Sequence, residues 1–202
     1  MKEESLKDLL DTQCWLYDVN TDPYQVFAEA FSTAVIGSFR RFIKNIMHYA
    51  ETNEIYSEKS PCDVLLFMRM VRSLIKASDN LKGIKKGPII VTEAEAFNKK
   101  YFRSHYITTS DWEDFPHFLS VKEFCNPYMV FKKFFKYQHA DKWLYDLKEI
   151  VDAALSNYKG ELGLEMIAMY SHLVKLIEAA HLINVREVTH IGGILKNRGL
   201  VS

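Results

Sequence analysis

Two stretches of this chain begin with nearly the same six residues, and they lie 104 positions apart. Asp22 to Phe27 reads DPYQVF, and Asn126 to Phe131 reads NPYMVF. An ungapped alignment of residues 22–50 with residues 126–154 gives eight identities in 29 positions. Because several identities are aromatic residues inside the expected helices, where capping does not require them, we predict a duplicated helical unit.

The alternative interpretation is that two unrelated amphipathic helices open in the same way. Asp or Asn followed by Pro is a common start, because the carboxylate or amide caps the helix and Pro needs no donor at the first position. We favour the duplication and place its units at residues 22–75 and 126–178. These are the limits of the aligned similarity; as parts of the domain, the two units extend a little further, to about residues 80 and 183.

The fold class follows from periodicity and composition. Only 8 Gly and 5 Pro occur in 202 residues, which argues against a turn-dense all-β fold. Apolar residues recur at helical spacing over residues 3–17, 61–80 and 161–183. We therefore predict one all-α domain, residues 1–202, built as a helical bundle from two related units.

Between the units we expect an irregular, aromatic insert over residues 81–125. A helix over residues 92–103 is expected inside it, because Thr92 and Glu95 have capping-box spacing. We also expect a bend at Gly37 in the first unit, and a last helix in the tail interrupted at residues 192–193.

Charge and cysteine usage narrow the function classes. Lys plus Arg equals Asp plus Glu at 26 each, so no overall field attracts nucleic acid. The three cysteines are widely spaced, which favours reduced thiols over a disulfide framework. With neither a signal-peptide pattern nor an apolar run of membrane-spanning length, the expected location is cytoplasmic.

One pair of residues has the spacing of a known helical nuclease motif. Arg41 and His48 are seven positions apart, so on a helix they project from nearly the same face. This pattern resembles the Arg-x(4–6)-His motif of HEPN-type helical ribonucleases. The resemblance covers these two residues in a helical context and implies RNA binding or cleavage, with Arg41 and His48 as catalytic candidates.

Two Glu-x-x-His patterns raise the question of a metal site. Glu178 with His181, and Glu187 with His190, each place a carboxylate and an imidazole on one helical face. Helical di-iron proteins take such motifs from different helices. Because these two lie nine residues apart near one helix end, we expect no metal or other cofactor, and the four residues are secondary candidates only.

A basic strip with aromatic residues marks the second unit. It consists of Lys132, Lys133, Lys136, Tyr137, His139 and Lys142. Lysine charge beside stacking rings can bind single-stranded nucleic acid. A solvated lysine face over an apolar core explains the same pattern. We name these six residues as the candidate binding strip, with nucleic acid as its alternative partner.

No specific catalytic motif occurs, whereas aromatic helical faces and a groove between the units are expected. The acidic residues Asp111, Glu113 and Asp114 around Trp112 add a candidate partner-binding loop. The leading hypothesis is therefore a non-enzymatic protein-interaction or regulatory module that binds another protein or a second copy of itself. The alternative is a HEPN-like RNA-binding protein or ribonuclease.

Overall fold

The computed structural model of this chain describes residues 22–58, 60–90, 95, 97–104, 110–157, 162–191 and 194–195. The helix expected over residues 3–17 lies outside this part. Six long helices form the body of the fold: α2 (Pro23–Thr33), α3 (Ile36–Glu51), α4 (Pro61–Leu81), α8 (Tyr128–Tyr137), α9 (Ala140–Leu155) and α10 (Met166–Glu187). The predicted all-α bundle is confirmed.

Shorter elements complete the described structure: η1 (Lys99–Tyr101), α6 (Asp111–Asp114), α7 (Val121–Cys125), β1 (His190–Ile191) and β2 (Ile194–Leu195). Two expectations were wrong here. The helix expected from Thr92 does not run on to residue 103: Glu95 is helical, but residues 97–98 are not, and residues 99–101 form a 3-10 turn. In place of a helix, the described part of the tail forms an antiparallel pairing of β1 with β2, in which His190 faces Leu195 and Ile191 faces Ile194.

The starts of α2 and α4 follow the capping chemistry expected from the sequence, but that of α8 does not: Pro127 is its N-cap residue, no side chain caps it, and the Asn126 amide donates to the Lys86 carbonyl. The Asp22 carboxylate accepts a hydrogen bond from the backbone N–H of Tyr24, and Ser60 accepts one from Asp63. The bend expected at Gly37 is displaced, because extended backbone at residues 34–35 separates α2 from α3. Gly37 itself lies inside α3.

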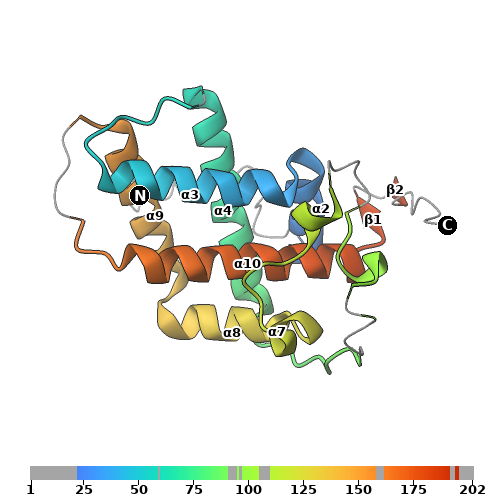
Figure 1. Ribbon diagram of the computed structural model, residues 1–202. Coiled ribbons are helices and arrows are strands. Elements are labelled where there is room, and N and C mark those ends of the chain that lie inside the picture. Colours follow the sequence, from blue (N-terminus) through green and yellow to red (C-terminus); the bar gives the residue numbers. More distant parts are fainter. Residues whose placement is uncertain are drawn as a thin grey trace, which may run out of the picture.

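The helices share one hydrophobic core, with α10 at its centre (Figure 1). α10 contacts α2, α3, α4 and α8, while α3 packs along α9. Among the described helices, α10 alone has the length and hydropathy to cross a membrane, but 67% of its most apolar window is buried. That burial is typical of the core helix of a soluble protein, whose apolar face is covered by neighbouring helices.

Helices of the two predicted units correspond closely. α3 and α9 are both 16 residues long, and their first residues are 104 positions apart. Two pairs of counterpart residues also touch each other. The hydroxyls of Tyr24 and Tyr128 are 3.0 Å apart, and the ring centroids of Phe27 and Phe131 are 6.0 Å apart. Contact between counterparts is expected where a twofold axis relates two units. The duplication itself stays a prediction.

Candidate functional site

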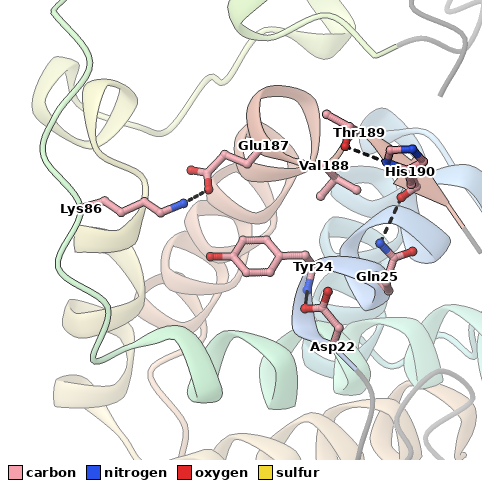
Figure 2. A pocket seen from close by; sticks show the side chains of 8 residues that line it. All are labelled: Asp22, Tyr24, Gln25, Lys86, Glu187, Val188, Thr189 and His190. Carbon is pink, nitrogen blue, oxygen red and sulfur yellow. Dashed lines mark hydrogen bonds and ion pairs between the residues drawn. The ribbon is translucent and has the colours of Figure 1, made fainter. Parts of the chain in front are cut away.

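A hollow of about 380 Å³ opens where the start of α2 meets the end of α10 (Figure 2). Its lining is mostly polar and comprises Asp22, Tyr24, Gln25, Lys86, Glu187, Val188, Thr189 and His190. Residues 22–25, at the start of α2, form one side of it, and residues 187–190, at and just after the end of α10, form another. The volume is in the range of pockets that hold small molecules or side chains.

A chain of hydrogen bonds joins the two units beside this hollow. The Tyr128 hydroxyl donates to Glu187 over 2.7 Å, and it lies 3.0 Å from the Tyr24 hydroxyl. Since the Tyr128 proton is given to Glu187, Tyr24 donates to Tyr128. Burial, together with both of these neighbours, raises the pKa of Tyr128. The phenol therefore stays protonated and holds Glu187 in place.

Lys86 closes the hollow from the loop that follows α4. Its ammonium forms an ion pair with Glu187 and lies 5.5 Å from the ring centroid of Tyr24 and 5.1 Å from that of Tyr128. Partial burial lowers the pKa of Lys86, but the hydrogen bond and charge of Glu187 outweigh this, and the pKa is raised. Lys86 is therefore an ammonium ion at neutral pH.

A buried ion pair attaches the insert to the bundle. Glu178 on α10 is fully buried and accepts from Arg40 on α3 over 2.8 Å. The same carboxylate accepts the backbone N–H groups of His117 and Phe118. Arg40 also donates to the carbonyl oxygens of residues 113 and 115, at 2.6 and 2.7 Å. Two charged side chains of the bundle thus fix residues 113–118 through their backbone.

Arg186 makes a second attachment of the insert. Its guanidinium donates to the carbonyl oxygens of Tyr101 and Phe124 and lies 4.4 Å from the centroid of the Phe124 ring. Burial lowers the pKa of Arg186 to about 10, so it is still charged at neutral pH. The irregular insert is therefore held by charged donors as well as by apolar packing.

Three near-parallel rings lie on the outside of the insert, and we call them the insert aromatic surface. Phe115 stacks with Phe97 at 5.4 Å and with Trp112 at 5.8 Å. Trp112 is 65% exposed and Phe97 is 67% exposed. His117 Nε2 donates to the Trp112 carbonyl, and the His117 ring lies 4.8 Å from the Trp112 ring, which fixes the tryptophan.

The acidic residues near Trp112 differ in burial and in the contacts that they make. Asp114 is buried and accepts from the backbone N–H of Ser104, so it supports the insert and is not part of a binding surface. Asp111 pairs with Lys99 and Arg103, and the hydrogen bond from Lys99 lowers the pKa of Asp111 despite slight desolvation. The rim of the insert aromatic surface is therefore of mixed charge.

The basic strip is partly neutralised. Its four lysines, Lys132, Lys133, Lys136 and Lys142, are exposed, as are Tyr137 and His139. Lys133 pairs with the buried Glu123 at 2.8 Å, and Lys142 pairs with Asp146. The strip lies on α8 and the start of α9, separate from the hollow and its lining.

Glu123 is a buried carboxylate whose contribution to stability is lost in acid. Burial alone would raise its pKa, but hydrogen bonds from Lys133, Ser120 and Lys175 outweigh burial, and the pKa falls to about 2. The unfolded chain has an ordinary Glu pKa of about 4.3. The stabilisation from Glu123 is therefore present above about pH 4.3 and is lost as the pH falls towards 2.

Glu123→Gln is expected to make unfolding less dependent on pH in this window, because the amide cannot titrate. Urea unfolding at pH 7 and pH 3 measures the effect. The wild type should lose more stability between the two pH values than Glu123→Gln does. Glu51→Gln, at an exposed position of α3, is the control and should behave as the wild type. Equal losses in all three proteins would contradict the assignment.

Arg41 and His48 are both exposed on α3. The predicted helix and the shared face are therefore present, and the His48 ring lies 5.5 Å from the ring of Tyr49. Neither residue lines the hollow between the units.

The four metal candidates do not come together. Glu178 accepts three hydrogen bonds, one from Arg40 and two from the backbone N–H groups of His117 and Phe118. His181 is buried, and its Nε2 donates to the Phe102 carbonyl. Glu187 is held by Tyr128 and Lys86, while His190 is exposed at the hollow. Among the described residues, no group of three or more His, Cys, Asp or Glu side chains could hold a metal ion.

Sequence reasoning did not find Arg40, Lys86 or the joint role of Tyr24 and Tyr128. Arg40 carried a signal, because it lies four residues after Ile36 and three before Ile43, on the apolar face of its helix. The two tyrosines gave a second signal, because counterpart residues of two related units would meet near the axis between them. Nothing in the sequence around Lys86 indicates that this residue pairs with the distant Glu187.

Comparison with known proteins adds no relative: no family model, curated protein or solved structure matches this chain.

Proposed function

We propose that this chain is a non-enzymatic protein-interaction module of the cytoplasm, and that its partner binds at the insert aromatic surface. The observation that carries the proposal is the exposure of Trp112 and Phe97 in a stack that the bundle holds in place. Tryptophan is strongly enriched among residues that dominate binding energy, and exposed apolar patches mark interaction sites.

Rigidity supports this choice of surface. A buried ion pair and four backbone hydrogen bonds orient residues 113–118, although desolvating Arg40 and Glu178 is costly. A preorganised surface loses less side-chain entropy when it binds. The ring faces suit aliphatic or proline side chains of a partner protein, and the mixed-charge rim suits polar groups around them.

The test compares two variants of exposed apolar residues. Trp112→Ala removes one of the two exposed rings of the stack, and Ile167→Ala, which changes a side chain that is 85% exposed at the start of α10, is the control. A partner captured from cells by the wild type is purified and titrated against all three proteins. Loss of roughly 2 kcal/mol or more of binding energy is expected for Trp112→Ala, with none for Ile167→Ala.

A partner that binds Trp112→Ala and the wild type equally well would overturn the proposed surface. Sedimentation of the purified protein over a range of concentrations covers the case of a second copy as partner. Self-association that is lost in Trp112→Ala would identify the partner as another molecule of this chain.

The HEPN-like alternative rests on the exposure of both Arg41 and His48 along one face of α3. Incubation of the protein with structured and single-stranded RNA tests it. Cleavage by the wild type that is absent in both Arg41→Ala and His48→Ala would favour a ribonuclease. Binding that depends on Lys132 and Lys136 without cleavage would favour the basic strip as an RNA-binding surface.

A further inference from the structure

The Lys86 ammonium occupies a setting that is typical of cation recognition. The rings of Tyr24 and Tyr128 lie within 6 Å of it. The Glu187 carboxylate pairs with it, as Figure 2 shows. Aromatic faces combined with a carboxylate bind alkylammonium ions, because the ring quadrupole and the negative charge both attract a cation. We propose that Tyr24, Tyr128 and Glu187 form a binding site for an alkylammonium group, and that Lys86 is an internal occupant that competes with the ligand.

The three binding groups are positioned without help from Lys86. Tyr128 is buried and donates to Glu187, and Tyr24 donates to Tyr128 in turn. The start of α2 is capped by Asp22, which fixes the backbone of Tyr24. Departure of the Lys86 ammonium therefore leaves the rings and the carboxylate in the same arrangement.

Lys86 is the most easily displaced member of the cluster. Residues 82–88 are all exposed, and the Lys86 side chain is 44% exposed. Its backbone is tethered, because Asn126 donates to its carbonyl oxygen over 2.8 Å. An ion pair of this exposure contributes little to stability, since water screens it. The ammonium can leave Glu187 while the loop stays attached.

The adjoining hollow determines which ligands fit. Among its eight lining residues, Lys86 is the one lysine or arginine, whereas Asp22 and Glu187 are both acidic. With Lys86 swung out, the hollow carries two carboxylates and selects cations over anions. Its volume of about 380 Å³ leaves room for an alkyl chain behind the ammonium group. The ligand is either a free alkylamine or the lysine side chain of a protein.

Lys86→Gln tests the proposal, because it keeps a polar side chain only one bond shorter and removes the competing charge. Lys85→Gln, at the neighbouring exposed position, is the control. Each full-length protein is titrated with n-butylammonium, with a blocked lysine peptide and with inorganic phosphate at constant ionic strength, while the tyrosine ring signals are followed by NMR. If Lys86 fills the site in most molecules, Lys86→Gln should bind the cations roughly tenfold more tightly than the wild type.

Adding Glu187→Gln to Lys86→Gln should abolish this gain. Tighter binding of the peptide than of butylammonium would identify a protein lysine as the ligand, and the reverse would identify a free amine. Equal cation binding by Lys86→Gln and Lys85→Gln, or a preference of Lys86→Gln for phosphate, would overturn the proposal.

The wild type provides a second measurement that needs no variant. Saturating butylammonium should displace Lys86 from Glu187 and raise the ratio of acetylation at Lys86 to acetylation at Lys85, as measured by mass spectrometry with a water-soluble reagent. The ratio is used because the free amine consumes reagent and slows both lysines equally. An unchanged ratio when the site is saturated would show that Lys86 does not compete for it.

Discussion

Replacing Arg40 with alanine is expected to lower the free energy of unfolding by about 3–5 kcal/mol, because the change leaves Glu178 buried without its cation. Glu178 is fully buried on α10, and Arg40 is its charged partner at 2.8 Å. The carboxylate would keep only the backbone N–H groups of His117 and Phe118. Chemical unfolding followed by far-UV circular dichroism measures the loss.

Arg41→Ala is the matched control, since it removes the same side chain from the next position on α3. Arg41 is exposed, so its replacement should change stability by no more than about 0.5 kcal/mol. Similar effects of the two substitutions would show that the ion pair between Arg40 and Glu178 contributes little to stability.

The same variant also tests the link between the attachment and the proposed binding surface. Without Arg40, the carbonyl oxygens of residues 113 and 115 lose their donors. The insert aromatic surface should then become more mobile. Quenching of Trp112 fluorescence by acrylamide should therefore increase, at denaturant concentrations where the bundle is still folded. Unchanged quenching in a folded Arg40→Ala protein would show that the surface is positioned by packing alone.

The bundle could be predicted because its signals are local. Capping by Asp22 and Ser60, prolines at first helical positions and a helical period of apolar residues each act within one or two turns. The ungapped correspondence between residues 22–50 and 126–154 agrees with the equal length of α3 and α9, which the structure shows. Local chemistry was sufficient for these elements.

The insert and the site could not be predicted in the same way, because they depend on contacts across the chain. Lys86 meets Glu187 over 101 positions, and Arg40 meets Glu178 over 138. Capping-box spacing at Thr92 favoured a helix that runs to about residue 103, but residues 99–101 form a 3-10 turn, and the Tyr101 carbonyl accepts a hydrogen bond from the distant Arg186. Such tertiary contacts outweigh local helix propensity.

Replacing Phe131 with alanine is expected to cost about 3–5 kcal/mol of stability, the range for a fully buried aromatic residue. Phe131 is fully buried on α8, where its ring meets that of Phe27 on α2 at 6.0 Å. The substitution leaves a cavity that packed helices on both sides cannot readily fill. Met129→Ala on the same helix is the control, because Met129 is 39% exposed, and a change within about 0.5 kcal/mol is expected for it.

The pairing of Phe131 with its own counterpart makes the prediction more specific. If the two rings are equivalent positions about an axis, Phe27→Ala should cost about as much as Phe131→Ala. The double variant should then lose less than the sum of the single losses, by about 0.5–1.5 kcal/mol, the usual worth of a buried aromatic pair. Urea unfolding of the four proteins in this cycle measures the coupling. Fully additive losses would show that the two units do not stabilise each other through these rings, and clearly unequal single losses would argue against an equivalent role for the two positions.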